Sequence, residues 1–321
     1  MDGSEAAPDV HSRAPVNPGS EPQPVLERAR DGAVELSVIV VTHNSSAVLD
    51  GLISSLTKYP PRAPWELIVF DNASREDVVA VFKARLPHVS AIAGAANIGF
   101  AAGVNAAAGK AKGRWLFLAN PDIRWEGGVL DRLMQFLEEH PRAAAVSPRL
   151  VFPDGRPQLS IRRFPNHANI WFSRGTPWGA WVSSLRWFGS YTLSDPQSPA
   201  TVEAVSAASL MVRAGVFRSV GGMDPEFFLY VEDTDLCRRL SDHGWEVWID
   251  PTIAVTHRWG AATKRDPTLG AYHRQSVRRY FLKHHANKPV RNAILFGVLL
   301  MADWWDRLRK RMSLERSARS G

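Results

Sequence analysis

Two short acidic motifs carry residues that could support acid–base or metal chemistry. Asp122 ends the motif Asn-Pro-Asp, and Glu232 and Asp233 begin the motif Glu-Asp-Thr-Asp. An ionised carboxylate beside a substrate hydroxyl can act as a general base. Acidic residues in the first turn of a helix can also simply complement the helix dipole, so the second motif has a structural alternative. His257 could join Asp122 in a set of oxygen and nitrogen metal ligands, although most lone histidines are structural.

The elements around these motifs indicate where they lie. Continuous apolar runs predict buried strands at 36–44, 67–70 and 116–123, and helical spacing of apolar residues separates the first two strands. This alternation of strands and helices predicts a parallel, doubly wound α/β sheet. The strands end in Thr42-His43-Asn44, Asp71-Asn72 and Asn120-Pro121-Asp122. Ligands of such sheets bind at the carboxyl edge, so we expect these polar tips to converge on one crevice.

A small-residue stretch, 94–113, lies between the second and third of these strands. Gly99 precedes an alanine-rich segment that predicts a helix closed by Gly113. A helix that starts beyond a glycine turn favours an anionic group at its N-terminus, and the alternative is a closely packed helix without a ligand. The chain contains no Walker motif and no dinucleotide-binding glycine fingerprint.

The second half of the domain contains one irregular stretch and the acidic helix. Residues 162–200 are rich in Trp, Gly, Ser and Pro, which indicates either a functional loop or lid or a disordered segment. Its tryptophans could form a binding wall for a sugar or a lipid, or could equally pack in the core. A helix is expected to open at Glu232 and to stop at Gly244. A strand around 245–249 and a second strand that ends at His257 are expected to follow.

These motifs together resemble those of a known enzyme family. The segments VIVVTHN, DNAS, NIGFAAGVN, NPD, FFLYVEDTDL and VTHRWG occur in family order between Leu36 and Gly260. The chain resembles the inverting nucleotide-sugar glycosyltransferases of family 2, in the branch that includes bacterial rhamnosyltransferases of cell-envelope polysaccharides. The resemblance implies the GT-A fold, a Rossmann-like α/β fold with a mostly parallel central sheet flanked by helices, followed here by a C-terminal helical extension.

The resemblance also implies roles for individual residues. Asp233 would deprotonate the acceptor with support from Glu232, and Asp122 and His257 would hold a divalent metal ion, Mg²⁺ or Mn²⁺. Many relatives have two carboxylates where this chain has Asn120 and Asp122, so weaker metal binding is expected. The residues assigned to the donor are Thr42, Asn44, Asp71, Asn97, Gly99, Asn105 and Asn120. The stretch 162–200 would be an acceptor-side loop or lid, and the residues assigned to the acceptor side are Arg162, Arg163, Trp178 and Tyr230.

The same resemblance implies the substrates. The donor would be a nucleoside-diphosphate sugar, linked to thymidine or uridine, with L-rhamnose from dTDP-rhamnose preferred because of the branch resembled. The acceptor would be a glycan or a lipid-linked saccharide. Two alternatives are a catalytically silent module that binds sugar nucleotides, which the missing first carboxylate would permit, and a nucleotidyltransferase on a related sheet.

Composition and charge divide the chain into three parts. Residues 1–34 are proline-rich with little apolar periodicity and are expected to be a disordered leader without a secretory signal. Residues 35–262 form the predicted glycosyltransferase domain, and 263–321 form a basic, amphipathic helical extension. From Val255 onward the chain carries 15 Lys and Arg against 4 Asp and Glu, a net +11 that exceeds the +7 of the whole chain. The remainder is therefore acidic.

The extension and the single cysteine bear on location. The apolar run at 293–302 is shorter than the roughly 20 residues that span a bilayer. Residues 290–312, with Trp304 and Trp305 beside basic residues, could lie on an anionic membrane, or could pack on the domain or a second subunit. A cytoplasmic protein, peripheral at the inner face of the cytoplasmic membrane, is expected. Cys237 is expected to pack as a small apolar residue. No nucleic-acid partner is expected, because the excess of positive charge lies in this tryptophan-bearing amphipathic extension and the rest of the chain is net acidic.

Overall fold

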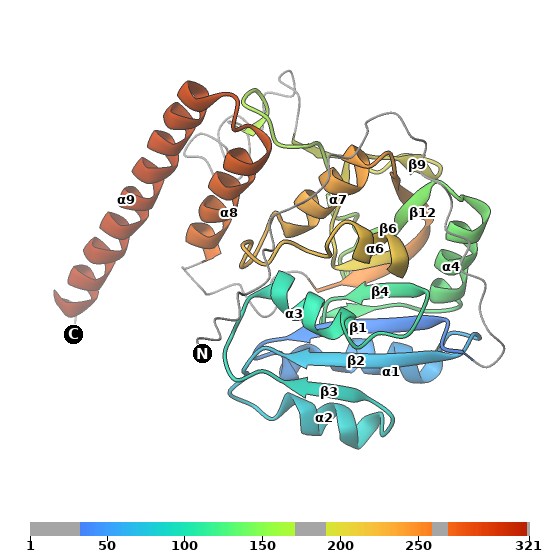
Figure 1. Cartoon of the computed structure of the whole chain (residues 1–321). Helices are drawn as coiled ribbons and strands as arrows, with labels where there is room; N and C mark the ends of the chain where they lie inside the picture. Colours follow the sequence, from blue (N-terminus) through green and yellow to red (C-terminus); the bar gives the residue numbers. More distant parts are fainter. Residues whose placement is uncertain (1–32, 171–190, 259–268, 320–321) are drawn as a thin grey trace, which may run out of the picture.

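A mixed β-sheet forms the centre of the molecule in the computed structural model, which describes residues 33–170, 191–258 and 269–319 (Figure 1). Within these residues the sheet has nine strands, in the order β3-β2-β1-β4-β11-β6-β12-β5, with β9 beside β12. The strands are β1 (Leu36–Thr42), β2 (Trp65–Asp71), β3 (Ser90–Ala93), β4 (Trp115–Ala119), β5 (Ile123–Arg124), β6 (Ala143–Val151), β9 (Ala200–Thr201), β11 (Ser209–Arg213) and β12 (Glu246–His257). A smaller sheet contains β7 (Ile161–Arg162), β8 (Thr192–Leu193) and β10 (Ala204–Val205).

The pairing of the strands confirms half of the predicted topology. Strands β3, β2, β1 and β4 are all parallel, as the alternation of strands and helices predicts. Strand β11 is antiparallel to both β4 and β6, so the sheet is mixed rather than parallel throughout. The regular alternation of strands and helices runs from β1 to β4, and it therefore does not determine the direction of β11.

Helices cover both faces of the sheet, which gives three layers (Figure 1). Helices α1 (Asp50–Lys58), α2 (Val78–Arg85) and α4 (Val129–Glu139) pack on one face. Helices α3 (Phe100–Ala108), α6 (Ala214–Ser219) and α7 (Glu232–Asp242) pack on the other. Along β1, Val38 and Val40 face the first layer while Ile39 and Val41 face the second, which explains the uninterrupted apolar run of this strand.

Three predicted boundaries differ from the structure. The strand expected at 116–123 ends at Ala119, and a separate short strand begins at Ile123, because Pro121 cannot donate a ladder hydrogen bond. The helix after Gly99 ends at Ala108 rather than at Gly113. Strand β12 is one strand of 12 residues with a register shift between Asp250 and Ala254, where two strands were expected.

The C-terminal extension is a pair of helices, α8 (Leu269–His284) and α9 (Pro289–Arg319), at one end of the molecule (Figure 1). This confirms the predicted helices and extends the second one. Among the described residues, none of the helices combines the length and the apolar content that a membrane crossing requires. The predicted leader lies outside the described residues, apart from its last two positions.

Cys237 lies inside the layer formed by α7 and the sheet. Its side chain is fully buried among apolar residues of this layer. Burial raises the pKa of the Cys237 thiol to about 12, so the group stays protonated and packs as a small apolar residue, as predicted.

Candidate functional site

The carboxyl ends of β1 and β2 hold a buried polar cluster. Thr42 and Asp71 are neighbours in the parallel register, and the Thr42 hydroxyl donates to Asp71 Oδ1 at 2.9 Å. Asp71 also accepts from the Ser74 hydroxyl at 2.5 Å and from the Ser74 N–H at 3.1 Å. The Asn44 N–H donates to Ser74 Oγ at 2.8 Å, which brings Asn44 to the same edge. The structure therefore places three of the predicted donor residues together.

A glycine turn continues this edge towards helix α3. Gly99 has a φ of +88°, and a Cβ at this position would lie only 2.5 Å from the carbonyl oxygen of Phe228. Asn97 Oδ1 accepts from the Gly99 N–H at 3.0 Å and so stabilises the turn. Asn72 binds the turn as well, through Gly99 O at 2.9 Å and Ile98 N at 2.7 Å. Sequence reasoning assigned no role to Asn72 in this turn, although it is part of the predicted strand tip.

Asn105 has a different environment from the other predicted donor residues. Its Nδ2 donates to the Met223 carbonyl at 2.6 Å, and its Oδ1 accepts from the Met223 N–H at 2.9 Å. The side chain thus connects α3 to the segment that leads to α7. Its predicted contact with the donor stays a prediction.

Asp122 and His257 face each other at the end of β4 and β12. Asp122 Oδ1 lies 3.2 Å from His257 Nε2, and both side chains are buried. Asn120 Nδ2 lies 3.5 Å from the same ring nitrogen. The antiparallel pairing of His257 with Ile123 brings these residues together from positions more than 130 residues apart in the chain.

Gln158 fixes the tautomer of His257. The Gln158 amide nitrogen donates to the His257 carbonyl at 2.6 Å, so its Oε1 is left to accept from the ring Nδ1 at 2.9 Å. In the neutral ring, a proton on Nδ1 leaves the lone pair of Nε2 directed towards Asp122 Oδ1. Two lone pairs that face each other need a cation between them, or a proton on Nε2.

This pair fits a divalent metal ion that also binds phosphates. Among the described residues, no group of three or more His, Cys, Asp or Glu side chains could hold a metal ion. A hard cation bound by one carboxylate, an imidazole and substrate phosphates does not need such a group. The orientation of His257 by Gln158 is the arrangement that ligating histidines commonly show. Asp122 and His257 therefore have the chemistry to hold such an ion, and their role as metal ligands stays a prediction.

Asp233 lies in the first turn of α7 with both carboxylate oxygens partly occupied. Its Oδ2 accepts from Arg162 Nη1 at 2.8 Å and lies 3.4 Å from the Ala207 N–H. Its Oδ1 accepts from the N–H and the hydroxyl of Thr234 at 2.7 and 3.1 Å. A carboxylate offers about four lone-pair sites, and these four donors lie within reach of them, so an acceptor hydroxyl at Oδ2 would take the place of the longest contact, the one from Ala207.

Glu232, beside it, is buried with its Oε2 atom unpaired. Burial, and then the charge of Asp233, raise the pKa of Glu232 from its ordinary value of 4.5 to about 8. Glu232 is thus held as a neutral acid at neutral pH. Tyr230 and Val231, immediately before the helix, have φ values of +70° and +68°. Left-handed backbone at two consecutive non-glycine residues is costly and is concentrated at functional sites.

The end of β4 and Asp233 are joined through a short turn before β11. The Asn120 N–H donates to the Ala208 carbonyl at 2.9 Å, and the preceding residue, Ala207, contacts Asp233. The turn therefore holds the end of β4 and the start of α7 at one edge of the sheet.

The predicted acceptor-side residues divide into three groups. Arg162 forms an ion pair with Asp233. Burial disfavours the charged form of Arg162, but the charge of Asp233 and of neighbouring groups outweighs burial and raises the pKa of Arg162. Tyr230 contacts the His273 ring at 5.9 Å, whereas the Arg163 side chain is exposed. Trp178 and residues 171–190 of the predicted lid lie outside the described residues.

Sequence reasoning missed Gln158 beside His257, and also two residues near Asp233. The Tyr191 hydroxyl bonds to Thr234 and interacts with Arg162 and Asp233, while burial raises its pKa. His273, on α8, lies near Arg162 and Asp233, and burial followed by the charge of Arg162 lowers its pKa to about 4. His273 is thus a neutral polar group beside the carboxylate. Neither residue lies in a motif that could have identified it.

Comparison with solved structures defines the class of protein. The mannosyltransferase PcManGT from Pyrobaculum calidifontis, solved in complex with GDP-Man and Mn²⁺, superposes with a TM-score of 0.54 at 17% identity, over 92% of this chain and 80% of that chain. The protein has the GT-A glycosyltransferase fold, which confirms the predicted fold class.

Comparison with known sequences then defines the family. The profile described as Glycosyl transferase family 2 matches residues 37–192. The N-acetylglucosaminyl-diphospho-decaprenol L-rhamnosyltransferase of Mycobacterium tuberculosis is 31% identical over 262 residues, which cover 75% of this chain and 82% of that protein. The dTDP-rhamnosyl transferase RfbF of Shigella flexneri is 31% identical over 103 residues, 32% of each chain. The chain belongs to glycosyltransferase family 2 and is a glycosyltransferase similar to rhamnosyltransferases.

Proposed function

We propose that this enzyme transfers L-rhamnose from dTDP-rhamnose to a glycan or lipid-linked acceptor in cell-envelope polysaccharide synthesis, with inversion at the anomeric carbon. The names of two relatives, one a rhamnosyltransferase for a decaprenol-linked saccharide and one a dTDP-rhamnosyl transferase, support the donor and the acceptor class. A uridine-linked donor is the alternative that the same site could bind.

Asp233 is the proposed general base. Its Oδ2 would take the proton of the acceptor hydroxyl. At the same time the hydroxyl oxygen would form a bond to the anomeric carbon of the donor sugar, and the bond from that carbon to the diphosphate oxygen would break. Such a single displacement inverts the anomeric configuration. Arg162 and Thr234 would hold the carboxylate in place through the contacts described above. Because Glu232 would be a neutral acid, no second negative charge would lie beside the Asp233 carboxylate.

Asp122 and His257 are the proposed metal ligands. A bound divalent cation, Mg²⁺ or Mn²⁺, would supply positive charge for the diphosphate that leaves. Asn120 replaces the second carboxylate of many relatives, so the ligand set carries one negative charge less. Thr42, Asn44 and Asp71 are proposed to bind the nucleoside, and Asn97 and Gly99 to border the diphosphate at the start of α3.

The observation that carries this proposal is the position of Asp233. Asp233 lies at the N-terminus of α7 and has a cationic partner in Arg162. It is joined to the end of β4 through Ala207 and Ala208. We expect Asp233→Asn to lower turnover by about 10²- to 10⁴-fold without unfolding the protein, since general-base catalysis contributes this much. Asp242→Asn, at the other end of the same helix, is the matched control.

The test is the release of nucleoside diphosphate from a panel of thymidine- and uridine-diphosphate sugars, with Mn²⁺, Mg²⁺ or chelator and a lipid-linked acceptor. Release from dTDP-rhamnose that is lost with chelator and in Asp233→Asn supports the proposal. Near-normal turnover by a folded Asp233→Asn protein would remove Asp233 from its role. Release of pyrophosphate would indicate a nucleotidyltransferase instead, and saturable nucleotide binding without turnover would indicate a silent binding module.

A location follows from the proposed acceptor. If the acceptor is a lipid-linked saccharide, the enzyme would act as a peripheral protein at the inner face of the cytoplasmic membrane. The basic C-terminal extension supports this part of the proposal, because the cytoplasmic leaflet is negatively charged.

A further inference from the structure

Helix α9 is apolar on two opposite faces. Leu295, Leu299 and Ala302 are buried, and the two leucines form one cluster with Val277 and Phe281 of α8. Packing on α8 covers this face of the helix.

The opposite face, which we call the outer stripe, consists of Val290, Ile294, Met301 and Trp304. These side chains are 72%, 58%, 58% and 63% exposed. At 3.6 residues per turn they fall within an arc of about 80°, on the side of the helix opposite Leu299. An exposed row of large apolar side chains on a helix already packed on its other side indicates a second contact surface.

The inner face of α9 has a full set of partners on the protein. Asp303 accepts from Arg274 at 2.5 Å, and the Arg278 guanidinium lies 5.3 Å from the centre of the Phe296 ring. Asn292, near the start of the helix, bonds to His167 at 2.8 Å. These contacts fix the rotation of the helix about its own axis, so the outer stripe is held away from α8.

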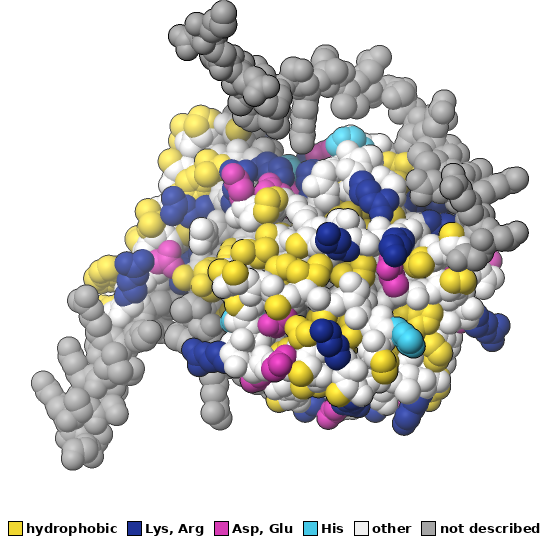
Figure 2. All heavy atoms as spheres, turned by 60° about the horizontal axis from the view of Figure 1, so that its bottom comes forward, with side chains coloured by type: hydrophobic (Ala, Val, Ile, Leu, Met, Phe, Trp, Pro, Cys, Tyr) yellow, Lys and Arg dark blue, Asp and Glu magenta, His cyan; other side chains and the backbone are white. Residues whose placement is uncertain are grey.

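We propose that the outer stripe of α9 docks on the surface of an anionic lipid bilayer. Arg291 and Arg307 are exposed and lie about 100° to either side of the stripe. Arg309, Lys310 and Arg311 follow in the sequence. Apolar and tryptophan side chains flanked by basic ones suit a helix that lies in the bilayer interface. In Figure 2 the outer edge of this helix, at the left, shows yellow apolar and dark blue basic side chains interleaved.

Charge also favours an anionic bilayer over a second copy of this chain as the partner of the outer stripe. A two-fold contact through the outer stripe would bring the basic flanks of both copies to the same interface, where like charges repel. An anionic bilayer offers the opposite charge. Each Lys or Arg near such a surface contributes about 1 kcal/mol to binding.

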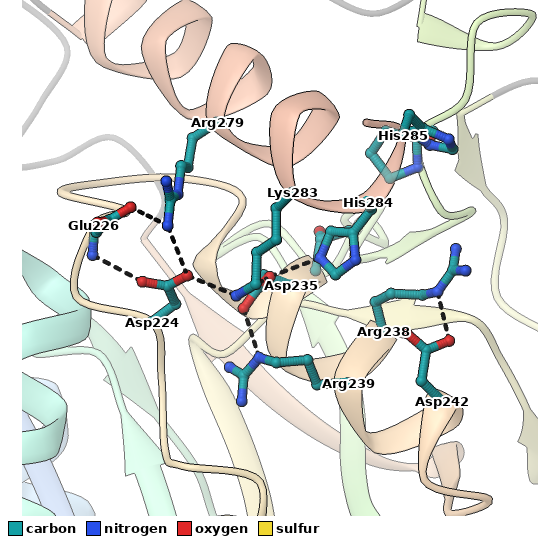
Figure 3. Close-up of polar contacts among 12 residues, drawn as sticks. Asp224, Glu226, Asp235, Arg238, Arg239, Asp242, Arg279, Lys283, His284 and His285 are labelled. Atoms are coloured by element: carbon teal, nitrogen blue, oxygen red, sulfur yellow. Dashed lines mark hydrogen bonds and ion pairs between the residues drawn. The ribbon is translucent and has the colours of Figure 1, made fainter. Parts of the chain in front are cut away.

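Helix α9 is joined through α8 to α7, the helix that carries Asp233. Asp235, fully buried two residues beyond Asp233, binds Lys283 at 2.9 Å and His284 at 2.8 Å on α8, and Arg239 at 2.8 Å on α7 (Figure 3). Lys283 also binds Asp224, just before the segment that leads to α7. Helix α8 therefore links the outer stripe to the start of α7. If the proposed function holds, docking would present Asp233 to a lipid-linked acceptor in a fixed orientation.

The test is sedimentation of the full chain with vesicles of phosphatidylglycerol and phosphatidylcholine, compared with phosphatidylcholine alone, at low and high salt. We expect binding to the anionic vesicles that weakens with salt. Trp304→Glu, and separately the double change Ile294→Glu with Met301→Glu, should lower the partition coefficient at least tenfold. Tyr59→Glu, which places the same charge at an exposed aromatic residue following α1, should leave it unchanged. Circular dichroism checks that each variant is folded.

Three outcomes would overturn the docking proposal. The unaltered protein could stay in the supernatant with anionic vesicles at low salt, or both stripe variants could sediment as it does. Light scattering could instead give twice the mass of one chain for the unaltered protein and the mass of one chain for the stripe variants. That result would assign the outer stripe to a contact with a second copy. No donor or acceptor is present, so these results are independent of turnover and would leave the proposed reaction untouched.

Discussion

Gln158 is the residue on which the orientation of His257 depends. It accepts from the ring Nδ1 and is itself held by the carbonyls of His257 and Val151. We expect Gln158→Leu to weaken Mn²⁺ binding by about 10- to 100-fold, the usual effect of losing a hydrogen-bonding partner of a metal-ligating histidine. Electron paramagnetic resonance of unbound Mn²⁺ measures this directly, without substrate.

A matched variant separates this role from a general loss of stability. Gln135→Leu makes the same change at an exposed position on α4, where the amide binds Glu139. This variant should bind Mn²⁺ as the unaltered protein does. Equal affinities for all three proteins would show that Gln158 does not orient a metal ligand.

Glu232 makes the free energy of unfolding depend on pH. Because its pKa is about 8 when folded and near 4.5 when unfolded, the folded protein binds one more proton between these values. The free energy of unfolding then falls as the pH rises through this window, and the stabilisation is complete only below it. Glu232→Gln keeps the shape of the neutral acid and cannot titrate. Between about pH 5 and 8 its melting temperature should fall less steeply than that of the unaltered protein, and parallel curves would contradict the assignment.

At the scale of elements, the contact between α7 and α8 depends on Asp235. Burial opposes its charge, but His284, Arg239 and Lys283 outweigh burial and lower the pKa of Asp235 from 3.8 to about 2. The contribution to stability is therefore present above pH 3.8 and is lost as the pH falls towards 2. Asp235→Asn leaves buried cationic partners unpaired, which costs about 3 kcal/mol or more.

Denaturant unfolding of Asp235→Asn should show this loss, together with faster amide exchange in α8. Asp242→Asn is the comparison, because it breaks an exposed pair with Arg238 four residues away on the same helix (Figure 3). That change should cost about 0.5 kcal/mol or less. Similar losses in the two variants would mean that the Asp235 network does not hold α8 in place.

The elements that the sequence predicted well are those with an unambiguous period. Strand β1 was predicted to within two residues, because it has an uninterrupted apolar pattern and a clear end. Strand β3 was missed, since its four residues are only partly buried and show no apolar pattern. The antiparallel direction of β11 was also missed, because direction depends on the connection between strands rather than on the strand itself.

In the candidate site, the residues in motifs were predictable and their partners were not. Asp122, His257, Asp233 and Thr42 lie in short motifs at element ends, where polar residues interrupt apolar runs. Their partners, such as Gln158 and Tyr191, come from segments with no pattern of their own and reach the site only through the tertiary fold. Local sequence contains no information about contacts across such distances.

At the scale of the whole molecule, a backbone hydrogen bond connects the glycine turn before α3 to the segment that leads to α7. The Phe100 N–H, at the start of α3, donates to the Phe228 carbonyl at 2.8 Å, four residues before α7. Nucleoside diphosphate binding should therefore slow amide exchange at 227–232 as well as at 97–100. Exchange in α2, on the other face of the sheet, should not change. Protection confined to 97–100 would show that the two parts of the site respond independently.

The single buried cysteine makes the molecule suitable for spectroscopic labelling. Cys237 is the one thiol of the chain, and its burial and high pKa keep it from reacting with maleimides or other electrophiles. A cysteine introduced at any exposed position would be the sole reactive thiol, without removal of the native one. A fluorophore or spin label could thus be attached at one chosen site on α9, and the distance of that site from a bilayer surface could be measured in the otherwise unaltered protein.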